Sequence, residues 1–125
     1  MKRIIQLWFP VIAWAGLIFC LSSIPGLSSG LEYDHILRKT AHVLEYLILT
    51  FFLYRAFQGT FQLNALSLFF YPVVLSFFYA VSDEFHQLFV PHRNGDLMDV
   101  LIDGIGIFGF YIVKKFLRKI LKWLK

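Results

Sequence analysis

Residues 63–87 read LNALSLFFYPVVLSFFYAVSDEFHQ, an apolar run that ends in a dense group of ionisable side chains. The run from Leu63 to Val81 is close to the roughly 20 residues that a helix needs to cross the hydrocarbon core of a membrane. Ionisable groups are costly there, and those that occur usually face the interior of a helix bundle or a water-filled cavity. The stretch therefore predicts a membrane helix that contributes to a polar site.

Three more segments of the chain have a similar length and an apolar composition. We therefore expect an all-α fold, an integral membrane bundle of four transmembrane helices that forms a single domain over residues 1–125. The four helices are expected at about residues 4–21, 36–57, 63–81 and 97–116.

The composition of the whole chain favours the same class of protein. The chain has 125 residues, of which 58% are hydrophobic and 16% charged, and its mean hydropathy is +0.67. A soluble domain of this size has too little interior to bury so much apolar surface, so lipid must cover part of it. The apolar run at residues 4–21 is longer than the core of a typical signal peptide, which favours an uncleaved first helix. A single cysteine, Cys20, excludes an intrachain disulfide.

Basic residues are concentrated at the two ends of the chain. Because basic residues beside membrane helices are retained in the cytoplasm, four crossings predict a multi-pass protein with both termini cytoplasmic. The tail can also attract anionic membrane lipids. This distribution, and the absence of a nucleic-acid-binding module, argue against nucleic acid as a partner. The basic residues at the two ends are Lys2 and Arg3, and then Lys114, Lys115, Arg118, Lys119, Lys122 and Lys125.

The second apolar segment contains His42 and Glu45, which lie three residues apart and share a face of a helix. A histidine and a carboxylate at this spacing can form an acid/base pair or provide two metal ligands. The alternative is a buried structural pair, with Arg38 neutralising Glu45 from one turn further out.

The densest polar run is at residues 82–87, at the end of the third segment. On a helix, Asp83, His86 and Gln87 share one face, and Glu84 points about a quarter turn away. Two adjacent carboxylates in a poorly solvated place are typical of proton transfer or cation binding. A solvated helix end would explain one or two of these side chains, but not all of them.

The fourth segment adds Asp96, Asp99 and Asp103, which form a stripe of carboxylates on one helix face. Asp96 is placed to cap the N-terminus of the helix. Asp103 lies about two turns into an apolar helix, where capping cannot explain it. Arg93, in the preceding loop, can bind a phosphate or carboxylate of a substrate, or hold Asp83 or Asp99 in place, and the sequence favours neither role.

Two of these stretches resemble the VanZ-like family of membrane proteins. They are KTAHVLEY at residues 39–46 and SDEFHQLFVPHR at residues 82–93, which continues to Asp99, Asp103 and Gly106. The similarity extends from about Pro10 to Gly109. The family is named for an accessory protein of glycopeptide resistance, associated with teicoplanin, and the resemblance implies a small multi-pass protein of the bacterial cell membrane. It marks as the functional site His42, Glu45, Asp83, Glu84, His86, Gln87, Arg93, Asp99 and Asp103.

Three functions fit these residues. The first is an intramembrane enzyme near the outer leaflet that acts on a lipid, a polyprenyl phosphate or a cell-wall intermediate. The second is a non-catalytic binder or translocator of lipid, drug or cation. The third is a structural protein whose polar residues hold the bundle together. In an enzyme, the catalytic residues would be His42, Glu45, Asp83 and Glu84, and the substrate-binding residues His86, Gln87 and Arg93.

The negative charge of this site exceeds what nearby basic residues can offset. Either the carboxyl groups share protons, or a divalent cation is bound, with Asp83, Asp99 and Asp103 as candidate ligands. The residues lie on three helices without a recognised metal-binding spacing. The sequence therefore favours shared protons over a metal cofactor.

Overall fold

The structure is a computed structural model that describes residues 1–28 and 30–123. Within these residues the chain forms four α-helices and no strand, so the prediction of an all-α fold with four helices is confirmed. Each helix is a few residues longer than the sequence predicted. Lys125 of the basic tail lies outside the described residues. The helices are α1 (Lys2–Ser22), α2 (Asp34–Thr60), α3 (Ala65–Gln87) and α4 (Leu97–Trp123).

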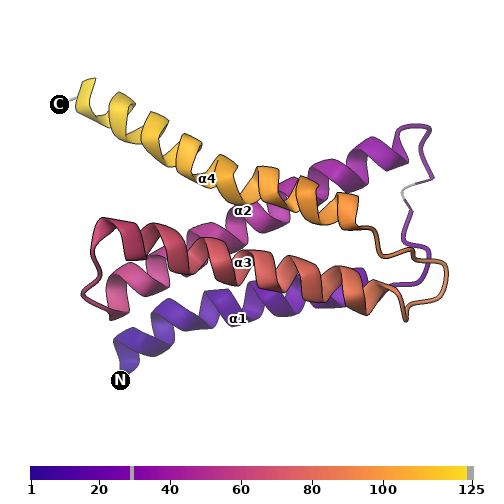
Figure 1. The fold of residues 1–125 in the computed structure, drawn as a ribbon, viewed down its shortest axis with the longest axis horizontal. Helices are drawn as coiled ribbons and strands as arrows, with labels where there is room; N and C mark the ends of the chain where they lie inside the picture. The colour runs from indigo at the N-terminus through magenta and orange to yellow at the C-terminus, as the bar shows by residue number, and fades with distance from the viewer. Residues whose placement is uncertain (29, 124–125) are drawn as a thin grey trace.

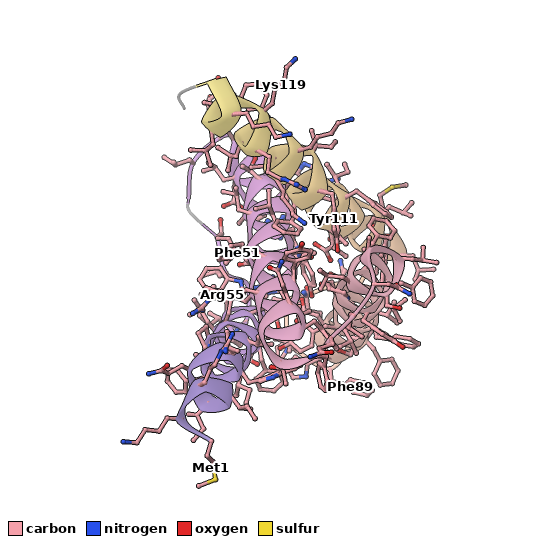
Figure 2. The ribbon with its side chains drawn as sticks, turned by 90° about the vertical axis from the view of Figure 1, so that its left-hand side faces the viewer. Met1, Phe51, Arg55, Phe89, Tyr111 and Lys119 are labelled. Carbon is pink, nitrogen blue, oxygen red and sulfur yellow. The ribbon has the colours of Figure 1, made fainter. Side chains whose placement is uncertain are left out.

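Helix α2 is the centre of the bundle, because it contacts each of the other three helices and packs most extensively against α4. In Figure 1, α1 and α3 run along each other, and α2 and α4 cross. The connections at residues 23–28, 30–33 and 88–96 lie together at one end of the bundle, which we call the loop end. Both termini lie at the other end (Figure 1). The last turns of α4, which carry Lys119, project beyond the bundle (Figure 2).

The close crossing of α2 and α4 depends on Gly106. A Cβ atom at this position would collide with the backbone carbonyl oxygen of Val43 on α2. Gly104 faces α3 instead, where a Cβ atom would lie 3.1 Å from the ring of Phe77. These glycines therefore let α4 approach both neighbours, as small residues do in membrane helix pairs.

The outer faces of the helices are largely apolar. Within the described residues, α1 and α3 are the two helices that are long and apolar enough to cross a membrane. The polar residues of α2 and α4 lower the hydropathy of those helices, but several of them point inward, and Asp103 is 0% exposed. Large apolar side chains on the same two helices point outward, among them Leu44, Leu101, Ile105 and Ile112.

Candidate functional site

A histidine–carboxylate pair joins α2 to α4 near the loop end. His42 Nδ1 lies 3.0 Å from Asp103 Oδ1, and the Asp103 side chain is fully buried. A carboxylate that accepts a hydrogen bond from Nδ1–H fixes the imidazole tautomer and leaves Nε2 free to accept a proton or bind a ligand. The spacing of His42 and Glu45 predicted a pair between these two residues, whereas in the structure His42 pairs with Asp103.

Two more carboxylates lie beside this pair. One ligand atom from each of His42, Glu84 and Asp99 can be chosen so that all three lie within 4.8 Å of one another. Glu84 Oε2 accepts a hydrogen bond from the backbone N–H of Asp96 at 2.8 Å, and Glu84 Oε1 is 3.4 Å from Gln87 Nε2. The site therefore combines side chains from α2, α3 and α4 that are far apart in the sequence.

The loop at residues 88–96 is held against the end of α3. Gly95 is required there, because a Cβ atom would collide with the carbonyl oxygen of Glu84. Asp96 Oδ1 accepts a hydrogen bond from the backbone N–H of Met98 at 2.9 Å, which confirms the predicted role of Asp96 at the start of α4. His92 has a positive φ of 59°, a conformation that glycine adopts more easily.

The polar run of α3 divides between two faces of the helix. Asp83, Glu84 and Gln87 are buried against the bundle, and Gln87 Nε2 donates to Asp83 Oδ2 at 3.1 Å. His86 turns instead towards α1, where its Nε2 lies 2.9 Å from Ser23 Oγ and its ring stacks on a phenylalanine. The sequence predicted that Asp83, His86 and Gln87 share one helix face. In the structure the inward face of α3 carries Asp83, Glu84 and Gln87, and His86 points towards α1 instead.

Two cavities lie next to the cluster formed by His42, Glu84, Asp99 and Asp103, and His42 lines both of them. The smaller, of about 150 Å³, includes Glu45 and Asp83 and reaches Ile18 on α1. The larger, of about 400 Å³, lies under the loop end and includes His35 and Asp99. The residues that line both cavities are Arg38, His42, Gln87 and Arg93.

Arg38 does not neutralise Glu45. Its Nε forms an ion pair with Asp34, one turn earlier on α2, at 3.2 Å, and its side chain is 49% exposed. Among the described residues, no ion pair joins Arg38 to Glu45. The sequence left open a buried structural pair of His42 and Glu45, with Arg38 neutralising Glu45. The structure does not have this arrangement, because Arg38 pairs with Asp34 and His42 pairs with Asp103.

Arg93 anchors the loop end to α1. Its Nη2 donates to the carbonyl oxygen of Leu21 at 2.9 Å, and its Nε donates to that of Ile24 at 3.2 Å. Within residues 1–28 and 30–123, it forms no ion pair with Asp83 or Asp99. Because a guanidinium has five N–H donors, Arg93 keeps donors for an anion in the cavities that it lines.

Two buried oxygen atoms of the site lack a hydrogen-bond partner within the part of the chain that the structure describes. They are Asp103 Oδ2 and the hydroxyl oxygen of Tyr46. Both residues are 0% exposed, and buried polar atoms are rarely left unsatisfied. Tyr46 is not among the site residues predicted from the sequence. Its position four residues after His42, on the same face of α2, is the signal that could have identified it.

Comparison with known proteins finds one family. A family model described as VanZ/LLP1 matches residues 7–118, a range that includes every residue of the cluster. Comparison with curated proteins and with solved structures finds no match. Together with the two apolar helices, the family indicates a membrane protein. The chain belongs to the VanZ/LLP1 family, as the motifs at residues 39–46 and 82–93 implied.

Proposed function

We propose that all four helices cross the bacterial cell membrane, with both termini in the cytoplasm. The outward apolar side chains of α2 and α4 support this for the two helices whose composition is mixed. The two termini lie at the same end of the bundle (Figure 1), as an even number of crossings requires. Basic residues flank both ends of the chain, and such residues favour the cytoplasmic side.

A reporter fusion tests this topology. A reporter that is active only outside the cytoplasm should be silent when fused after Lys125 and active when inserted in the connections at residues 23–33 or 88–96. The connection between α2 and α3 should behave like the C-terminus. Activity after Lys125 would overturn the proposed orientation, and with it the placement of the site.

In this orientation the loop end faces the outside of the cell, and the polar site lies near the outer leaflet. We propose that the site acts on an anionic lipid or cell-envelope amphiphile, the class of molecule that such a site meets. The observation that carries this proposal is the pair of cavities with Arg38 and Arg93 in their linings and His42 between them. The arginines would hold the anionic headgroup, because guanidinium groups bind phosphate and carboxylate in a fork.

The chemistry of an enzyme would centre on the His42–Asp103 pair. His42 would act as the general base through Nε2, oriented by Asp103. Glu45 and Asp83 line the smaller cavity with His42, where a protonated carboxyl could return a proton. Gln87 lines both cavities, so it is better placed than His86 to contact the substrate.

A non-catalytic binder or translocator is the alternative. It would use the same cavities and the same arginines, so binding alone does not separate it from an enzyme. All eight acidic residues of the chain lie in the connections and helix turns towards the loop end. A path for ions across the whole membrane would need polar groups in the other half as well, so this distribution argues against long-range cation transport. The family's link with glycopeptide resistance agrees with an envelope substrate in either case.

Replacement of Arg38 tests anion binding without disturbing the core. In its ion pair with Asp34, Arg38 is 49% exposed and Asp34 is 20% exposed, and ion pairs near the surface contribute only about 0–1 kcal/mol to stability. Arg38→Gln should therefore fold normally but retain less anionic amphiphile in native mass spectra of protein released from membranes. Arg55→Gln is the matched control, because Arg55 is an exposed arginine near the other end of the same helix. Equal retention by both variants would contradict the proposed binding mode.

A further inference from the structure

His42, Glu84 and Asp99 form a set of three potential metal ligands on three different helices. Their nearest ligand atoms lie within 4.8 Å of one another. Bonds of about 2.0–2.2 Å to a shared ion would bring such atoms to about 3.3 Å apart, so the ion would draw these side chains closer together. One imidazole with two carboxylates is a donor set for a divalent transition metal, since Mg²⁺ and Ca²⁺ take oxygen ligands.

Two of the three potential ligands, His42 and Glu84, are each supported by neighbouring groups. Asp103 Oδ1 holds Nδ1 of His42, which leaves Nε2 for an ion, and this is the usual carboxylate–histidine–metal arrangement. The carboxylate of Glu84 is positioned by the backbone N–H of Asp96 and by Gln87. Both of its oxygens keep a lone pair, so these hydrogen bonds do not prevent coordination.

A second observation also points to a cation at this place. Asp103 is 0% exposed, and Asp103 Oδ2 has no partner in the described residues. The same carboxylate bonds His42 through Oδ1, so Asp103 directly contacts one member of the three-ligand set. The arginines nearby make their close contacts with Asp34 and with backbone carbonyl oxygens instead. Within residues 1–28 and 30–123, no lysine or arginine therefore forms an ion pair with the carboxylates of this cluster, and His42 is the one basic side chain that contacts them directly.

We propose that His42, Glu84 and Asp99 bind one divalent transition-metal ion of the Mn²⁺ to Zn²⁺ series, with Asp103 as the residue that positions His42. The sequence favoured shared protons because its acidic residues showed no metal-binding spacing. The fold supplies the missing geometry by bringing three helices together. His42 and Asp99 also line the larger cavity, so an ion with three protein ligands would keep an open coordination position there. With an ion bound, Nε2 of His42 would hold that ion and could not also act as the general base, so this inference replaces that role of His42. It does not depend on the identity of the substrate.

Metal analysis of the purified protein tests the site. Wild-type protein, purified through a tag without histidines, should contain about one transition-metal ion per chain. His42→Asn, Glu84→Gln and Asp99→Asn should each lower that content by about tenfold or more. Asp96→Asn is the matched control, because it removes an exposed carboxylate three residues from Asp99 and leaves intact the backbone N–H that supports Glu84. Wild-type protein that binds no transition metal even after reconstitution would overturn the proposal, as would full metal content in the Glu84 and Asp99 variants.

A thermal measurement keeps the test valid if a variant folds poorly. Wild-type protein treated with a chelator should gain thermal stability on addition of Mn²⁺ or Zn²⁺, because the ion binds the folded state, and Mg²⁺ should have little effect. Asp103→Asn should weaken metal binding by about 10–100-fold without abolishing it, the usual effect of losing a partner of a metal-bound histidine. No thermal shift in the wild type, or an equal shift with every divalent ion, would contradict the site. If Glu84→Gln and Asp99→Asn lose metal but retain as much amphiphile as the wild type, the metal site is supported independently of the proposed function.

Discussion

Replacing His42 with leucine is expected to lower the free energy of unfolding by about 3–5 kcal/mol. The physical reason is that Asp103, which is fully buried, would lose the partner 3.0 Å away and become an uncompensated charge. The loss can be measured as a shift of the denaturation midpoint in detergent micelles. Arg38→Gln provides the comparison, because it removes a cation from the same helix face at an exposed position.

A double replacement separates a structural role of this pair from a functional one. Replacing a buried ion pair with apolar residues of similar size is often neutral or stabilising. His42→Leu combined with Asp103→Val should therefore recover most of the stability that His42→Leu loses. If the pair only holds the helices together, the double variant will also recover function. We expect it to remain inactive, because neither a base nor a metal ligand is restored.

Much of the fold follows from the sequence, because the hydropathy of each segment predicts a helix. The predicted C-terminal end of the third helix was wrong, and this difference has a clear physical cause. The expected helix ended at Val81, where apolar residues give way to polar ones. Helix α3 continues to Gln87 because Asp83, Glu84 and Gln87 are buried in the bundle and bonded there. Hydropathy alone cannot distinguish a polar helix end that faces water from one that faces a polar site.

The sequence contains enough information to predict which face of α3 points inward. Ser76 and Ala80 are small residues that mark the buried side of the helix. At about 100° per residue, Glu84 lies about 60° from the centre of that side, and His86 lies about 100° from it. The direction of His86 towards α1 follows from this geometry.

The partner of His42 could not be predicted from the sequence. His42 and Asp103 are separated by 61 residues, and helical spacing relates only residues within one helix. Their contact depends on how α2 crosses α4, which Gly106 permits through its close approach to Val43. Glu45, only one turn away, was therefore the partner that sequence spacing favoured.

Glu45→Gln is expected to abolish function while the fold remains intact. The Glu45 side chain lines the smaller cavity, and it makes no hydrogen bond within residues 1–28 and 30–123, so a neutral amide of the same shape removes only the charge. Loss of a residue that transfers a proton typically costs about 10²–10⁴-fold in rate. Equal abundance in membranes and an unchanged denaturation midpoint would show that the variant folds.

The most direct measurement of the central claim compares lipid extracts from cells that lack the gene. One set of these cells expresses the wild-type protein and another expresses Glu45→Gln at the same abundance. If the polar site acts on an envelope amphiphile, one class of amphiphile should differ between deleted and wild-type cells, and the Glu45→Gln extract should match that of the deleted cells. A Glu45→Gln extract identical to that of wild-type cells, with the deleted cells still different, would contradict the claim.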